Sequence, residues 1–153
     1  MGNDRSGCRV SILSDYFSAW NAYDADALMV MSTGDAVYTD MGWGHVFGPG
    51  ARASAEAMEF SRSFSSDLSL DFVSTYQHGA TYSGEWEVQG THDGCLLPLA
   101  LAATGKRFVL RGAAFLWTVE DAVGSVHSYW NPLDLLRQLG LEGLPVPDWD
   151  AWG

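Results

Sequence analysis

The stretch LSLDFVSTYQHGATYSGEWEVQGTH, residues 68–92, decides the fold class of this chain. It holds two long runs rich in β-branched and aromatic residues, which are typical of strands, and His78-Gly79 between them indicates a turn. Two similar runs follow, KRFVLRGAAFLWTVE at 106–120 and VGSVHSYWN at 123–131. The second half of the chain therefore predicts four consecutive strands.

The first half has a helical character. In residues 9–23 the apolar side chains recur at the spacing of one helix face. A short second helix is expected over 25–32, with Asp24 or Asp26 as its cap, and a third over 51–64. Helices thus gather early and strands late.

Three shorter segments complete the pattern. AVYTD at 36–40 predicts a strand, GWGHVFGPG at 42–50 predicts a loop, and Pro132 begins a short helix that Gly140 ends. The order favours an α+β fold over α/β. We expect a curved antiparallel sheet that wraps around the N-terminal helices and forms a cone with an open mouth.

Composition limits the organisation and the partners. The 153 residues suit one domain over residues 1–140 with a C-terminal tail over 141–153. Eight Lys and Arg against 19 Asp and Glu give a net charge of −11, which disfavours nucleic acid and anionic membranes as partners. The polar N-terminus and the widely separated Cys8 and Cys95 favour a reduced, cytoplasmic protein.

Familiar cofactor motifs are missing from the sequence. No two histidines are two to five residues apart and no HExxH occurs, so no metal site is expected. P-loop, GxSxG and dinucleotide-binding patterns are missing as well. The seven Trp, seven Phe and six Tyr instead suggest a cavity for a large apolar small molecule.

Alternation along EWEVQGTH, residues 85–92, makes His92 a candidate. Trp86, Val88, Gly90 and His92 share one strand face. An inward imidazole can move a proton or orient a carbonyl. The alternative is a strand-end histidine bonded to the backbone of the following loop.

The sequence does not show which face of the last predicted strand points inward. His127, Tyr129 and Asn131 alternate with Ser128 and Trp130, and either set can line a pocket.

GTHDG at 90–94, TGKRFVLRG at 104–112 and YWNPLDLLRQLG at 129–140 together resemble the SnoaL-like polyketide cyclases. These proteins belong to the superfamily of nuclear transport factor two, ketosteroid isomerase and limonene epoxide hydrolase. The resemblance covers roughly residues 10–140 and implies the α+β cone. It also implies a homodimer that holds its substrate in the cone without metal or organic cofactor.

The opening DYFSAWNAYDADALMVMSTGDAVYTDMG, residues 15–42, is similar to the start of ketosteroid isomerase. That likeness implies that Tyr16 is an oxyanion donor and that Asp40 moves a proton. Asp40 alternates with Tyr38 before a Gly-rich loop, where partial burial would raise its pKa and suit a general base. The isomerase's third group, a protonated Asp, falls near Ala114 or Phe115 and is missing.

The predicted site therefore has a catalytic and a binding set. Asp40, Tyr16 and His92 are the catalytic candidates. The substrate-binding candidates are Trp20, Tyr38, Trp43, Trp86, Trp117, Tyr129 and Asn131.

The resulting functional hypothesis is a cofactor-independent cyclase of bacterial polyketide antibiotic biosynthesis. It closes a ring on a linear polyene or polyketide, by an aldol-type reaction or a [4+2] cycloaddition. Members that form an indane ring in ionophore pathways resemble it. Aldol-type relatives carry a carboxylate where this chain has Asn131, which favours closure directed by shape. The alternatives are a ketosteroid-isomerase-like enzyme, an epoxide hydrolase using Arg111, or a non-catalytic binding or dimerisation module.

Overall fold

The computed structural model describes residues 12–141. Its helices and strands follow the predicted order, with helices mainly first and strands mainly last. In chain order they are α1 (Ile12–Ala22), α2 (Ala25–Val30), β1 (Ser32–Asp40), β2 (His45–Phe47), α3 (Ala53–Phe64), β3 (Ser69–His78), β4 (Thr81–Thr91), a 3₁₀ turn (Leu97–Leu99), β5 (Arg107–Val119), β6 (Ala122–Trp130) and α4 (Pro132–Gln138).

The six strands form one curved, unclosed sheet in the order β2-β1-β6-β5-β4-β3. β3 to β6 pair antiparallel as a meander, as expected. The expectation of a wholly antiparallel sheet is wrong at one place, because β1 runs parallel to β6. A long stretch of chain separates these two strands, so no tight turn fixes their relative direction.

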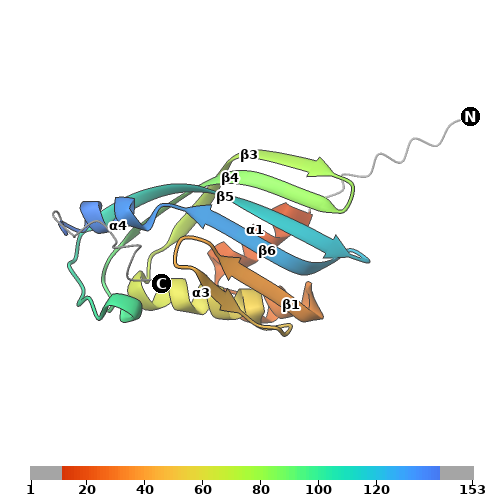
Figure 1. Ribbon diagram of the computed structural model, residues 1–153, viewed down its shortest axis with the longest axis horizontal. Helices are drawn as coiled ribbons and strands as arrows, with labels where there is room; N and C mark the ends of the chain where they lie inside the picture. Colours follow the sequence, from red (N-terminus) through yellow and green to blue (C-terminus); the bar gives the residue numbers. More distant parts are fainter. Residues whose placement is uncertain (1–11, 142–153) are drawn as a thin grey trace, which may run out of the picture.

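Helices α1 and α3 lie against the concave side of the sheet (Figure 1), where α1 contacts β3 and α3 contacts β1 and β2. The predicted apolar stripe of α1 is confirmed, since Leu13, Tyr16 and Phe17 are buried. Asp24 caps α2 through the Ala27 N–H at 2.9 Å, which satisfies one of the free donors at a helix start.

The segment 42–50 is more ordered than a loop. It contains β2, whose His45 and Phe47 pair with Asp40 and Tyr38 of β1. This strand could not be recognised from the sequence, because turn residues flank it and a run of three residues shows no clear alternation.

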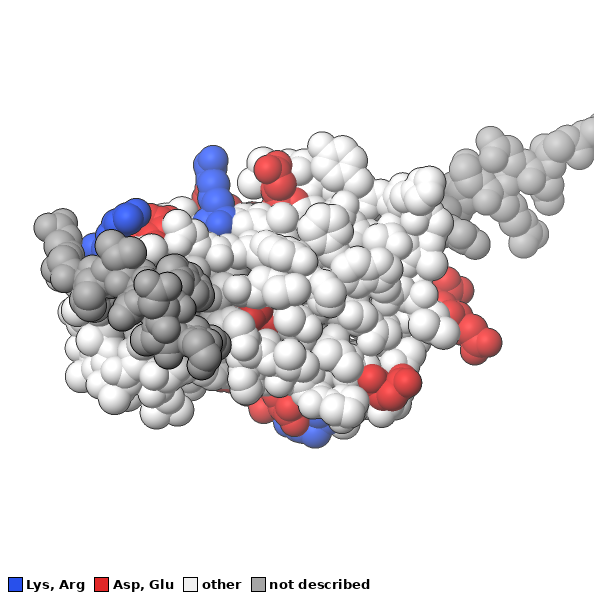
Figure 2. Space-filling model, viewed as in Figure 1, with Lys and Arg blue, Asp and Glu red and all other residues white. Residues whose placement is uncertain are grey.

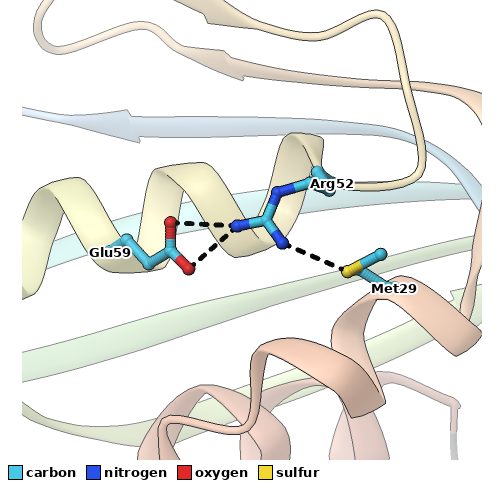
Figure 3. Close-up of polar contacts among 3 residues, drawn as sticks. All are labelled: Met29, Arg52 and Glu59. Carbon is cyan, nitrogen blue, oxygen red and sulfur yellow. Dashed lines mark hydrogen bonds and ion pairs between the residues drawn. The ribbon is translucent and has the colours of Figure 1, made fainter.

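A surface contact joins the start of α3 to α2. The Arg52 guanidinium donates to both carboxylate oxygens of Glu59, at 3.0 and 3.2 Å, and its other terminal nitrogen lies 3.4 Å from the Met29 sulfur (Figure 3). Both charged side chains are about half exposed, so solvent weakens the ion pair.

Most of the predicted tail, and Cys8, lie outside the described residues. Within residues 12–141, no helix has the length and apolar character needed to cross a lipid bilayer.

Candidate active site

A largely apolar cavity lies between α1, α3 and the concave face of the sheet. The cavity volume is about 70 Å³, within a hollow of about 640 Å³ that includes the open solvent at its mouth. The lining residues are mostly aromatic or aliphatic: Tyr16, Phe17, Trp20, Tyr38, Asp40, Trp43, Ser61, Phe64, Leu68, Leu70, Trp86, Val88, Phe108, Leu110, Ala114, Val126, Ser128 and Trp130. Among these described residues Asp40 is the single carboxylate.

Strand alternation supplies the polar wall of this cavity. On β1 the side chains of Tyr38 and Asp40 point inward, and both are buried. Ser128 of β6 lies directly beside Asp40 in the parallel register, and Trp130 follows two residues later on the same face. The polar groups of β1 and β6 therefore gather at one place in an otherwise apolar cavity.

Asp40 is held by two N–H donors on a single oxygen. The Trp43 backbone N–H and the Trp130 Nε1–H each donate to Asp40 Oδ1 at 2.9 Å. Oδ2 is therefore the oxygen that remains for a ligand. Burial raises the pKa of the Asp40 carboxyl above its ordinary value. The N–H donors of Trp43, Trp130 and Gly42 and the nearby His45 partly oppose this effect. A carboxylate made more basic in this way suits proton abstraction.

Gly42 allows the Trp130 ring to reach Asp40. A side chain at position 42 would overlap the Trp130 indole. The Trp43 ring packs edge-on against Trp130, with 5.0 Å between the ring centroids. The two indoles thus pack around the Asp40 carboxylate, and both line the cavity.

Tyr16 is in the cavity wall, but its proton is directed elsewhere. Its hydroxyl donates to Ser54 Oγ of α3 at 2.7 Å, and both residues are fully buried. Burial raises the Tyr16 pKa to about 12. Tyr38, whose ring lies between β1 and Trp20, also has a pKa raised by burial and by its neighbours Tyr16 and Asp40. Both phenols remain protonated at neutral pH.

The structure places His92 outside the cavity lining. Its side chain is on the inward face, as the alternation predicted, but lies beneath the loop 93–105 and is fully buried. The Thr104 backbone N–H donates to His92 Nδ1 at 3.1 Å, which places the ring proton on Nε2. Burial lowers the His92 pKa. This geometry is the strand-end alternative, bonding to the loop backbone.

Three expected binding residues are corrected by the structure. Trp117 and Tyr129 are 36 and 43 % exposed on the convex face of the sheet, because the neighbouring inward positions, Leu116 on β5 and Ser128 on β6, are even-numbered. Asn131 lies past the end of β6 and caps α4 through the Leu133 N–H at 3.0 Å. By contrast, Trp20, Tyr38, Trp43 and Trp86 all line the cavity as expected.

Sequence reasoning missed two partners of the site. Trp130 carried a signal, since the alternation on its strand left it as one of two inward choices. Ser54 carried none, because nothing local marks a serine of α3 as the acceptor of a phenol 38 residues away.

Two of the alternative functions lose their key group. The position expected for the third isomerase residue is occupied by Ala114, which lines the cavity with a methyl group. Arg111, the arginine considered for an epoxide hydrolase, faces outward and pairs with Glu87 at 2.9 Å, with its side chain 78 % exposed.

An open, curved sheet packed against helices is the ketosteroid-isomerase-like fold. A protein from Catenulispora acidiphila described with that fold superposes with a TM-score of 0.73 at 18% identity, over 86% of this chain and 93% of the other. The SnoaL-like domain family matches residues 13–124, and the chain belongs to this family.

Other solved structures agree with the fold. A proposed SnoaL-like polyketide cyclase from Jannaschia gives a TM-score of 0.76 at 13% identity, over 94% of this chain and all of the other (100%). IdmH, a proposed polyketide cyclase from Streptomyces antibioticus, gives 0.71 at 18% identity, over 84% and 96%. No curated protein sequence matches the chain.

Proposed function

We propose that this protein is a cofactor-independent cyclase that closes a ring on a linear polyene or polyketide of a bacterial antibiotic pathway. The observation that carries the proposal is the cavity itself. It is apolar, walled by aromatic rings, and contains a single carboxylate with one free oxygen. Membership of the SnoaL-like family and the proposed cyclases of the same fold support it.

The cavity contributes first by restricting the substrate. A flexible chain enclosed by these walls keeps few conformations, and those that bring the reacting carbons together are selected. Orientation of this kind lowers an activation barrier by up to about 7–11 kcal/mol in well-matched cases. The apolar walls also exclude water, which protects an enolate from protonation by solvent.

Asp40 supplies the chemical step in our proposal. Asp40 Oδ2 removes a proton from the carbon beside a carbonyl, and the resulting enolate attacks a second carbonyl of the same chain to form the C–C bond. The new alkoxide then takes the proton back from Asp40, which restores the carboxylate. Tyr38 and Tyr16 are the cavity phenols that can donate a hydrogen bond to the developing oxyanion. Tyr16 must first turn its proton away from Ser54. His92 has no part in this proposal, because its ring does not line the cavity.

A proton-transfer route is preferred to a pericyclic one for a specific reason. In the sequence, Asn131 favours closure by shape alone, because it stands where aldol-type relatives carry a carboxylate. Asn131 is exposed and caps α4, so its identity has no bearing on the cavity. Asp40, which does line the cavity, remains as the group that can act.

The test uses a synthetic linear polyene that carries two ketones, with the carbons beside both carbonyls deuterated, incubated with the protein in H₂O. Aldol-type closure breaks one of these C–D bonds to form the new C–C bond, so the ring product has lost one deuterium, which mass spectrometry detects. Cycloaddition breaks no C–D bond, so its product keeps all the deuterium while the polyene absorbance falls. Binding without any product would indicate a non-catalytic module. Asp35→Asn, an exposed carboxylate on the same strand, is the matched control for Asp40→Asn.

We also propose that two copies pair through the convex face of the sheet. Phe115, Trp117, His127 and Tyr129 gather there, with Trp117 stacked on Phe115 and 4.7 Å from His127 between ring centroids. Figure 2 shows that charged side chains are sparse over β5 and β6 and more frequent around the edge. An exposed aromatic patch with few charged side chains is suited to self-association, although the net charge of −11 opposes the approach of two copies.

Sedimentation measures this pairing. Trp117→Asp is expected to give a monomer, whereas Tyr76→Asp, at an exposed aromatic of the β3 edge, is expected to leave the dimer intact. A wild-type monomer would refute the pairing without affecting the cyclase proposal.

A further inference from the structure

The indole N–H of Trp20 is an unused hydrogen-bond donor in the cavity wall. Trp20 is in α1 and lines the cavity. Its Nε1 is buried from solvent and has no hydrogen-bond partner among the described residues. Leaving a buried donor without an acceptor is unfavourable, so such groups are rare unless a ligand or a water molecule completes them.

The neighbours of Trp20 do not satisfy this donor. The Tyr16 hydroxyl lies close to the Trp20 indole nitrogen, and this interaction lowers the Tyr16 pKa against the larger effect of burial. The indole N–H is not directed at the Tyr16 oxygen well enough to form a hydrogen bond. The Tyr16 proton is given to Ser54. Tyr38 packs its ring against Trp20 at 6.0 Å between centroids, tilted by 32°.

Trp130 provides the contrast within the same cavity. Its indole N–H is fully used, since it donates to Asp40 Oδ1. The Trp130 donor therefore stabilises the carboxylate, whereas the Trp20 donor is left on a different wall, on α1 rather than β6. The two indoles have the same chemistry and different roles.

We propose that Trp20 is a specificity-determining residue whose Nε1–H donates to a carbonyl or ether oxygen of the substrate. The inference rests on the proposed function, in that the cavity must take a substrate. An indole nitrogen can only donate, so it selects an acceptor oxygen and rejects an ammonium or a bare hydrocarbon at that point. The substrate class is thus an apolar, conjugated body with an acceptor oxygen directed to α1.

A pair of matched ligands isolates this hydrogen bond. 2-Acetylnaphthalene and 2-ethylnaphthalene have nearly the same shape, but only the first has an acceptor oxygen. Their dissociation constants are measured by calorimetry for the wild type, Trp20→Phe, Trp86→Phe and Tyr38→Phe. Trp86→Phe removes another cavity indole and controls for lost packing. Tyr38→Phe removes the competing donor on β1.

The wild type is expected to prefer the ketone by about tenfold, which corresponds to about 1.4 kcal/mol. Trp20→Phe is expected to abolish this preference, and Trp86→Phe and Tyr38→Phe to preserve it. The inference is overturned if the wild type shows no preference, if Trp20→Phe keeps it, or if only Tyr38→Phe removes it. Because none of these ligands needs to react, the result is independent of ring closure. A protein that shows the preference but forms no cyclic product would lose the proposed function and keep this donor.

Discussion

Replacing Asp40 by Asn and by Ala separates the two tasks that the structure gives to this side chain. Its Oδ1 accepts from the Trp43 N–H and the Trp130 Nε1–H, each at 2.9 Å. Its Oδ2 is the proposed base. The Asn amide oxygen can keep both hydrogen bonds but cannot take the proton, whereas Ala removes the acceptor as well.

The expected loss of activity follows from the proton transfer. General base catalysis contributes about 10²- to 10⁴-fold. Asp40→Asn is therefore expected to lower kcat by that amount with little change in stability. Activity is measured as the rate of ring formation from the linear diketone polyene, with Asp35→Asn as the control that retains full activity.

The expected effects on stability have opposite signs. Burial raises the Asp40 pKa, so the folded protein binds the proton more tightly than the unfolded chain. The wild type thus loses stability as the pH rises from the unfolded value of 3.8 through the folded pKa, and the loss persists at neutral pH. Asp40→Asn removes this cost and is expected to equal or exceed the wild type at pH 7. Its advantage should disappear near pH 4.

Asp40→Ala is expected to be less stable than Asp40→Asn by about 2 kcal/mol. In the Ala variant two partly buried N–H donors lose their acceptor, which costs about 1–3 kcal/mol for each donor. Water at the cavity mouth compensates part of this cost. Urea unfolding measures the difference in unfolding free energy between the Asn and Ala variants. Both variants lack the buried carboxylate, so the effect of its charge cancels in this difference. A loss of less than tenfold in kcat for Asp40→Asn would refute proton transfer by Asp40 and indicate closure by shape. Equal stability of the Asn and Ala variants would refute the proposed anchoring by Trp43 and Trp130.

Three further outcomes are expected. Gly42→Ala places a methyl group against the Trp130 indole and should lower the free energy of unfolding by about 1–3 kcal/mol, measured by urea unfolding; an unchanged midpoint would contradict the close packing. Arg52→Met breaks an ion pair that is about half exposed, so urea unfolding should show a loss below about 1 kcal/mol, and a larger loss would mean that this contact holds α2 and α3 together. Burial lowers the His92 pKa, so the wild type should lose stability as the pH falls below the unfolded value of 6.5 and through the folded pKa. His92→Gln, which keeps an acceptor for Thr104, should lose less stability between pH 7.5 and 5.5. Identical pH profiles of stability would refute this assignment.

Much of the site could be predicted because its cause is local. The alternation in AVYTD places Tyr38 and Asp40 on one face, and both line the cavity. The stripe of α1 likewise brings Tyr16 and Trp20 to the cavity. The placement failed for Trp117 and Tyr129, since alternation says that two sets of side chains face opposite ways but not which set faces inward.

By itself, the sequence determined the types and order of the elements other than β2, the α+β class and the family, because helix and strand periodicities are properties of neighbouring residues. Only the tertiary structure decided that β1 runs parallel to β6, that Trp130 bonds Asp40 across 90 residues, and that Tyr16 gives its proton to Ser54. These features depend on which faces are buried when distant segments pack together, and that choice is made by the whole core rather than by any local pattern.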